Sequence, residues 1–346
     1  MAVNRTERRD RVIETVVTSF LDTGKPVNSS FVSEESGLGL KPASIRSIMK
    51  ELEDDGFLEQ PHTSAGRVPT VKCYRYYVGH LMTEVGLREE DVAVLKTVIG
   101  SGADETDTEI FLRHMASVLS ELTDLVGVVM SPSVERSVFD RLEMVNLGGS
   151  SVLLVLSLSS GVVNTIRITL DRIVTIRAIE ETARLLNKRL HGLTVAEIKN
   201  TIGARLKHAP DGDRKLVEVI LRNSDRIFSL AGDRSVHVAG LSRALSRPEF
   251  SAIDHSLKLV SLFEEKSEIG QALSLSLVEA SDVSINIGGR GPWGSAPPLS
   301  LVSAMYLTGG SEGAVGVIGP ARVHYPRLKA IVRYAATYTS HFFSTC

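Results

Sequence analysis

Apolar residues in the first 60 positions recur at helical spacing in separate segments. The first helix buries one face and stops at Gly24, its apolar positions being Val12, Ile13, Val16, Val17, Phe20 and Leu21. A short second helix is predicted from about Ser29 through FVSEES, and GLGL forms the turn after it. The third helix begins with Pro42, which suits a first helical position. Its apolar side repeats at i, i+3, i+4 and i+7 through Ile45, Ile48, Met49 and Leu52.

The pattern changes after Gly56, where two short extended segments flank a polar loop. FLEQ and RVPT are predicted to be short strands on either side of QPHTSAGRVPT, residues 60–70. Its two prolines suit strand ends or sheet edges, and VKCYRYYVGHLM returns to helix. Three helices followed by a two-stranded ribbon is the order of a winged helix-turn-helix. We therefore predict such a domain over residues 1–85.

Beyond a polar junction the pattern indicates strands and helices of an α+β protein. An amphipathic helix begins near Asp107, and VGVVMS, RLEMVNL, SVLLVLSL and GVVNTIRITL indicate an antiparallel sheet. The chain is then mostly helical until sheet patterns return in SLVEASDVSINIGG and GAVGVIGP, before a last helix. This order predicts one sheet domain, residues 104–192 and 274–343, interrupted by an inserted, mainly helical domain over residues 193–273.

Bulk composition narrows the class of partner and compartment. The chain has 346 residues, 43% of them hydrophobic, and a net charge of −2, so a charge-driven partner must meet a local patch. Two cysteines give neither a disulfide framework nor metal-ligand spacing. The N-terminus is charged where a signal peptide needs an apolar core, and no apolar run reaches the ~18 residues of a membrane span. These features predict a cytoplasmic protein without a membrane partner.

Charge is segregated around the third helix and the loop behind it. Residues 41–50 carry three basic residues and no acid, residues 51–59 five acids and no base, and residues 60–80 three basic residues and no acid. Because arginine pairs with guanine and hydroxyls with phosphate, this pattern predicts a helix whose basic half meets duplex DNA while its acidic end points away. The alternative is that these charges are merely solvated.

Signals for cofactor, metal or catalytic chemistry are weak. GRGPWG, residues 289–294, matches a dinucleotide fingerprint literally, but SAPPL follows where that fingerprint requires a helix. The nine histidines are scattered without a metal-ligand pattern, and Ser64 lacks a nucleophile-elbow context. We therefore predict no cofactor, no metal and no enzymatic activity.

The stretch SIRSIMKELEDDGFLEQPHTSAGRVPT, residues 44–70, closely resembles the heat-inducible transcription repressor family HrcA, in which a PHTSAGRxPT wing follows the recognition helix. Weaker likeness continues through VAGLSRALSRPEF and LVSAMYLTGGSEGAVGVIGPARVHYPRL. The resemblance implies that the sheet domain is GAF-like and the inserted domain dimerising. It further implies a homodimer that binds an inverted repeat in chaperone operons, represses them and is kept active by the GroE chaperonin.

Carried over to this chain, the resemblance implies DNA contacts from the third helix and from the wing with the helix after it. The recognition-helix positions are Lys41, Ser44, Arg46, Ser47 and Lys50. The positions in the wing and the following helix are His62, Thr63, Ser64, Gly66, Arg67, Lys72 and Arg75. The chain departs from the family pattern at Lys41, Ser47 and Cys73, and in the stretch GGRGPWGSAPPL.

Two other functions stay open at this level. A winged-helix regulator whose GAF-like domain binds a small metabolite would respond to that ligand without chaperonin. An enzyme with an appended winged helix would need clustered titratable residues in the sheet domain, which the sequence does not display.

Overall fold

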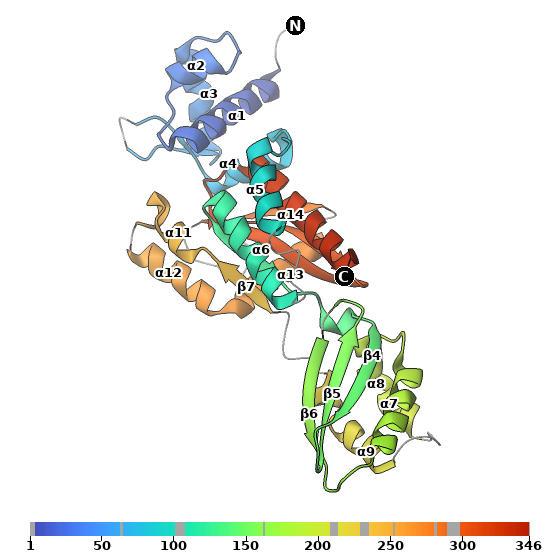
Figure 1. Ribbon diagram of the computed structural model, residues 1–346. Helices are drawn as coiled ribbons and strands as arrows, with labels where there is room; N and C mark the ends of the chain where they lie inside the picture. Colours follow the sequence, from blue (N-terminus) through green and yellow to red (C-terminus); the bar gives the residue numbers. More distant parts are fainter. Residues whose placement is uncertain are drawn as a thin grey trace.

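The chain folds into three units that lie one after another in space (Figure 1). The computed structural model describes residues 4–62, 65–100, 108–161, 163–207, 214–228, 235–251, 253–279, 282–288 and 298–345. We call the three units the N-terminal unit (residues 4–81), the central unit (89–130 and 235–345) and the inserted unit (134–228). No helix in the described part of the chain is long and apolar enough to cross a membrane.

The N-terminal unit has the predicted order of three helices and a two-stranded antiparallel ribbon. Its elements are α1 (Arg5–Thr23), α2 (Ser29–Glu35), α3 (Pro42–Asp54), β1 (Leu58–Glu59), β2 (Val68–Pro69), α4 (Val71–Tyr76) and the π-helical turn η1 (Tyr77–Leu81). α1 ends because Gly24 takes a left-handed backbone (φ 64°) and donates its N–H to the Phe20 carbonyl. Asn28 caps α2 by accepting from the Phe31 N–H at 2.9 Å, and Pro42 opens α3.

The central unit is a five-stranded antiparallel sheet between two helical layers. Its strands, in the order β7-β3-β10-β9-β8, are β7 (Val236–Ala239), β3 (Val126–Met130), β10 (Ser311–Pro320), β9 (Leu299–Thr308) and β8 (Val283–Ile287). Its helices are α5 (Glu89–Gly100), α6 (Thr108–Thr123), α11 (Leu241–Leu245), η3 (Pro248–Phe250), α12 (Ile253–Glu264), α13 (Lys266–Glu279) and α14 (Tyr325–Thr345). Successive residues of a strand point to opposite faces of the sheet. On β3, Val129 packs on the side of α6 and α14, and Val128 packs on the side of α12 and α13.

The inserted unit has its own sheet and its own core. Its elements are η2 (Val134–Arg136), β4 (Phe139–Asn146), β5 (Ser151–Leu158), β6 (Val163–Thr169), α7 (Ile176–Leu190), α8 (Val195–Leu206), α9 (Arg214–Arg222) and α10 (Ser224–Phe228). β5 lies between β4 and β6 in an antiparallel sheet, and its residues Leu154 and Leu156 pack against the helices. Asn187 on α7 pairs with free backbone groups on the outer edge of β4. Its side chain accepts from the Leu142 N–H (2.8 Å) and donates to the Leu142 carbonyl (2.9 Å).

This division corrects the predicted domain boundaries. The prediction placed residues 104–192 in the interrupted sheet domain and 193–273 in the insertion. In the structure, β4–β6 and α7 share one core with α8–α10, whereas β7 and α11–α13 belong to the central unit. Most strands are where the pattern placed them, but β7 lies in a stretch predicted to be mainly helical, β9 was not predicted, and residues 276–279 belong to α13 and not to a strand. Their assignment to one sheet failed because pairing is non-local: β3 bonds to β10 and β7, far along the chain, and not to β4.

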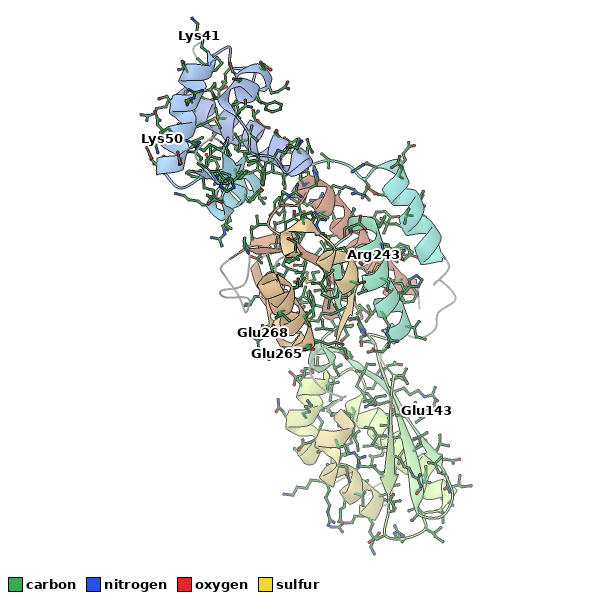
Figure 2. All side chains as sticks on the ribbon, turned by 90° about the vertical axis from the view of Figure 1, so that its left-hand side faces the viewer. Lys41, Lys50, Glu143, Arg243, Glu265 and Glu268 are labelled. Carbon is green, nitrogen blue, oxygen red and sulfur yellow. The ribbon has the colours of Figure 1, made fainter. Side chains whose placement is uncertain are left out.

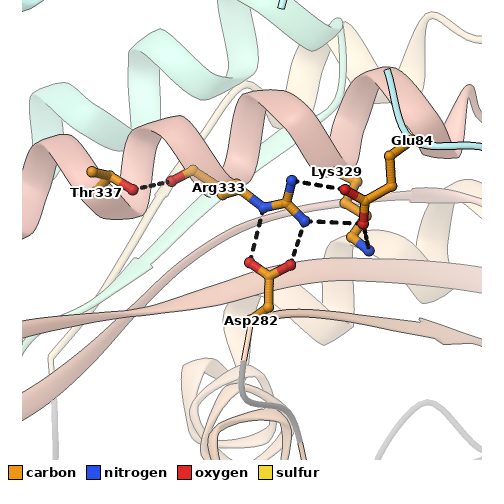
Figure 3. A network of polar contacts seen from close by, with 5 residues as sticks. All are labelled: Glu84, Asp282, Lys329, Arg333 and Thr337. Carbon is orange, nitrogen blue, oxygen red and sulfur yellow. Dashed lines mark hydrogen bonds and ion pairs between the residues drawn. The ribbon is translucent and has the colours of Figure 1, made fainter. Parts of the chain in front are cut away.

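The N-terminal unit is fixed against the central unit by ion pairs along the connecting segment (Figure 3). Glu84, which follows η1, pairs with Lys329 and with Arg333 on α14 (Arg333 Nη1 to Glu84 Oε2, 3.1 Å). Arg333 also donates to Asp282 beside β8 (Nε to Oδ1, 2.9 Å). Arg333 and Lys329 lower the pKa of Glu84 to about 2. The connecting segment is therefore tied to the central unit by charge.

The inserted unit meets the central unit through buried hydroxyl groups. Ser137, at the start of the inserted unit, lies with its Oγ 2.9 Å from that of Ser160 and 2.7 Å from that of Ser311. All three serines are fully buried. The turn between β9 and β10 comes so close that a Cβ on Gly309 would lie 2.0 Å from the Ser159 carbonyl oxygen. This junction is polar, whereas each unit beside it has an apolar core.

Candidate nucleic-acid interface

One face of α3 is exposed and carries the five predicted recognition-helix residues. Ile45, Met49 and Leu52 on the other face are between 0% and 3% exposed. The side chains on the open face are those of Lys41, Ser44, Arg46, Ser47 and Lys50. Because a helix repeats every 3.6 residues, the buried stripe leaves these positions outward. The structure therefore brings them together on one surface.

The two lysines of this face stand at opposite ends of α3 and point out of the N-terminal unit (Figure 2). Lys41 precedes the helix and makes no side-chain cap, as expected for a lysine at that position. Lys50 pairs with Asp54 (Nζ to Oδ1, 3.1 Å) and Glu53 (Nζ to Oε2, 3.3 Å). The hydrogen bonds that Lys50 donates to Asp54 and then to Glu53 raise its pKa, so it stays protonated. Its positive charge is therefore partly balanced by these two carboxylates.

The acidic end of α3 is paired within the N-terminal unit. Glu51 accepts from Arg5 of α1 at 2.9 Å, and Asp55 pairs with Arg9 one turn further along α1. Glu53 pairs with Arg67 of the ribbon at 3.0 Å. The acids behind the basic half of α3 therefore hold the first helix and the ribbon in place. The basic run RTERRDR near the N-terminus was a sequence signal for these partners, and the prediction did not use it.

The ribbon is pressed against the segment between α1 and α2. Val27 and Arg67 form an isolated antiparallel bridge, with N–H to carbonyl distances of 2.9 and 2.8 Å. A Cβ on Gly66 would lie 2.3 Å from the Val27 carbonyl oxygen. Gly66 is thus needed for close backbone approach, which is a different role from the predicted DNA contact. His62 is exposed at the loop. Thr63 and Ser64 lie outside the described residues.

Three residues that were predicted to contact phosphate have cationic groups that already contact other groups of the protein. The side chain of Arg67 is 17% exposed and bonds Glu53 through Nε and Nη2. Lys72 donates to the Asp55 carbonyl at 2.7 Å and lies over the Phe57 ring, 4.4 Å from its centroid. Arg75 donates to the Ile287 carbonyl of the central unit at 2.8 Å. The sequence could not predict these partners, because each one is remote in sequence or belongs to another helix or strand.

Elsewhere in the described residues the side chains give little opening for cofactor or metal chemistry. No group of three or more His, Cys, Asp or Glu side chains in those ranges could hold a metal ion. Burial raises the pKa of the Cys73 thiol to about 12, which keeps it protonated at neutral pH. The GRGPWG stretch lies outside the described residues.

Aromatic side chains occupy the space between the central sheet and the helices α6 and α14. Phe111 of α6 stacks on Phe342 of α14, with ring centroids 3.7 Å apart. Tyr306 donates its hydroxyl to the Met130 carbonyl at 3.0 Å. Its ring lies over Gly313, where a Cβ would come within 2.2 Å of a ring carbon. This tight packing gives no support to a ligand between these layers.

Comparison with known proteins places the chain in one family. The family model "HrcA protein C terminal domain" matches residues 109–328, which span the central and inserted units. The heat-inducible transcription repressor HrcA of Prosthecochloris aestuarii (strain DSM 271 / SK 413) is 36% identical, covering 99% of this chain and 98% of the relative. The protein of the same name from Chlorobium phaeobacteroides (strain BS1) is 35% identical and covers 98% of each.

A solved structure shares the overall fold. This crystal structure of a protein described only as hypothetical is 22% identical, covers 99% of both chains and superposes with a TM-score of 0.56. It supports the fold and carries no functional information. From the family model and the curated relatives, the chain belongs to the HrcA family, a family of heat-inducible transcription repressors and not of enzymes.

Proposed function

We propose that this protein represses chaperone operons by binding their operators through a winged helix-turn-helix formed by α1–α3 and the β1–β2 ribbon. The observation that carries the proposal is the open face of α3. Its hydroxyl and cationic side chains line one surface while the opposite face is buried in the unit's core. A helix of this kind fits the major groove, where Arg46 would pair with guanine and Ser44 or Ser47 with several bases.

The ribbon would serve as the wing beside this helix. His62 and the backbone of its loop are the groups that we assign to phosphate, while Arg67 holds the ribbon from within. Lys41, which has no capping role, would meet a phosphate at the start of α3. The DNA contacts that we retain are thus fewer than the sequence predicted.

We further propose that two copies act together on an inverted repeat. One recognition helix reads only a few base pairs, and a two-fold symmetric pair matches two-fold related half-sites. The resemblance to the family assigns the main contact between copies to the insertion, which here is the β4–β6 sheet with α7–α10. Such a regulator acts where the chromosome is, so we place it in the cytoplasm.

Control by the GroE chaperonin completes the proposal. A repressor that depends on a chaperonin must expose apolar segments when it is heated. The β5 sequence SVLLVLSL has strong strand formers, no charge and no proline. In the folded state it is the middle strand of the inserted sheet, where Val152, Leu154, Leu156 and Leu158 are at most 4% exposed. Heat would release this segment only by opening the inserted unit.

A gel-shift titration of the full chain tests DNA binding. The probe is a promoter fragment with an inverted repeat upstream of a chaperone operon of the same genome, compared with a scrambled duplex at several salt concentrations. Arg46→Ala should weaken the operator complex by about 1–3 kcal/mol and leave scrambled DNA nearly unchanged. Arg243→Ala is the matched control, since the Arg243 side chain is 45% exposed on α11 of the central unit and pairs with Glu121. Equal binding of operator and scrambled DNA by wild type would refute the proposal.

The small-ligand alternative gives a different result in the same assay. It requires operator affinity to change when a metabolite is added to purified protein without chaperonin. The chaperonin proposal requires instead that chaperonin with ATP restore binding to heat-treated protein. Full recovery after heating without chaperonin would contradict that part of the proposal alone.

A further inference from the structure

We infer that Glu53 and Arg67 form a positioning pair that sets the wing against the recognition helix, so that DNA affinity depends on an acidic residue beside the DNA-binding face. This inference rests on the proposed function, since it names how the site is held in shape. It also replaces the simple expectation that Arg67 contacts phosphate.

The pair joins the last turn of α3 to the ribbon. Arg67 donates to the same carboxylate oxygen of Glu53 from Nε at 3.2 Å and from Nη2 at 3.0 Å. The side chains are 17% and 22% exposed, so solvent screens this pair less than an exposed one. Among the ion pairs that link α3 to other elements of the N-terminal unit, those of α1 are more open: the Arg5 side chain is 77% exposed.

Arg67 is held at two points, which makes it suited to positioning. Its backbone bridges Val27 through two hydrogen bonds, and Gly66 beside it allows that approach. Its side chain reaches α3. The residue thereby connects the segment before α2, the ribbon and the end of α3. Releasing the guanidinium removes the side-chain link between the ribbon and the last turn of α3, while the Val27 bridge and the buried Leu58 still hold the ribbon. We expect the angle between the ribbon and the recognition helix to change as a result.

Electrostatics alone predicts the opposite effect of Glu53. A carboxylate near a DNA-binding surface repels phosphate, so removing it should tighten binding at every salt concentration. Lys50 would also lose one of its two acidic partners and become more available to phosphate. If Glu53 instead positions the wing, removing it weakens binding even though the surface becomes more basic. The sign of the change separates the two roles.

The decisive variant is Glu53→Gln in the full chain, with Asp54→Asn as its matched control. Asp54 is the next residue, is 64% exposed and pairs with Lys50 but not with the ribbon. We expect Glu53→Gln to weaken operator binding roughly tenfold, the effect of losing about 1.4 kcal/mol of charged hydrogen bonding. Asp54→Asn should bind as tightly as wild type or more tightly. The salt dependence should also flatten in Glu53→Gln, because wing contacts to phosphate are lost with the wing's orientation.

Exchange of the two charges distinguishes positioning from a general loss of folding. Glu53→Arg combined with Arg67→Glu recreates the pair in reverse, and Lys50 keeps Asp54 as a partner. We expect this double variant to recover most of the affinity that either single substitution loses. If Glu53→Gln also lowers the unfolding midpoint, the operator affinity of the double variant decides between positioning and loss of folding.

The outcomes are separable from those of the proposed function. Failure of wild type to prefer operator over scrambled duplex defeats the proposed function. Wild-type binding that is tightened by Glu53→Gln, or a charge-exchanged variant no better than Arg67→Glu alone, overturns the positioning pair and leaves the DNA-binding function intact.

Discussion

Replacing Gly66 by alanine should open the contact between the ribbon and the segment before α2. The added Cβ would lie 2.3 Å from the Val27 carbonyl oxygen and 2.9 Å from the Val27 nitrogen, both backbone atoms that cannot rotate away. Gly66 is not among the described glycines with positive φ, so space, and not backbone strain, excludes a side chain. The Val27–Arg67 bridge, with its two hydrogen bonds of 2.9 and 2.8 Å, must therefore separate.

The size of the effect follows from these contacts. Two backbone hydrogen bonds contribute about 1 kcal/mol each, and overpacking costs about 1–3 kcal/mol. Local opening should become easier by about 3 kcal/mol, which is roughly a hundredfold faster amide exchange. Hydrogen exchange at the Val27 and Arg67 amides measures it. Gly79→Ala is the control, since a Cβ there meets nothing within 4 Å. Exchange at those two amides within about threefold of wild type would refute the reasoning.

Three other properties can be checked in the same protein. Arg333 and Lys329 depress the pKa of Glu84 to about 2, so the ion pairs of Glu84 stabilise the fold above the ordinary glutamate pKa and lose their effect as pH falls toward 2. The difference in unfolding midpoint between wild type and Glu84→Gln should therefore shrink from pH 6 to pH 2. A constant difference would contradict this. Burial raises the pKa of Cys73 to about 12, so its thiol should react with iodoacetamide at pH 8 only as fast as the N-terminal unit opens. Labelling is measured in a Cys346→Ser background, and prompt labelling of the folded protein would count against the burial of Cys73. Since the inserted unit has a separate core, hydrogen exchange on stepwise heating should show β5 losing protection at a different temperature from α3, whereas simultaneous loss would indicate a single cooperative unit.

The parts of the fold that could be predicted are those that neighbouring residues decide. The buried and open faces of α3 follow from helical periodicity, and Gly24 and Pro42 mark helix ends through their own backbone preferences. Most strand positions were recognisable for the same reason, with β7 and β9 as the exceptions. The sequence did not predict which strands share a sheet. β3 pairs with β7 and β10, which follow the inserted unit in the chain, and the alternating pattern does not distinguish the strands of the inserted unit from those of the sheet that it interrupts.

The candidate site shows the same limit at the level of side chains. Exposure of Arg46 depends on its place in a helix, so the sequence could predict it. The partners of Arg67 and Arg75 depend on which carboxylate or carbonyl the folded chain brings within about 3 Å, and a basic residue in a basic stretch looks like a DNA contact until those partners are seen. Gly66 was expected to contact DNA, and the structure places it where backbone packs against backbone.

Charge balance explains why such a regulator would need two copies. Residues 1–88 contain twelve Lys and Arg against twelve Asp and Glu, which gives the N-terminal segment no net charge. Non-specific affinity grows with the number of phosphates neutralised, and five cations of this unit already pair with acids: Arg5, Arg9, Arg11, Lys50 and Arg67. A single unit should therefore bind duplex weakly, while two linked units gain roughly 10²–10⁴ in affinity from effective concentration. In the proposed two-copy assembly, heat that disturbs the link between copies would remove that factor while α3 stays unchanged, so we expect the proposed temperature response to arise in the assembly and not on the open face of α3.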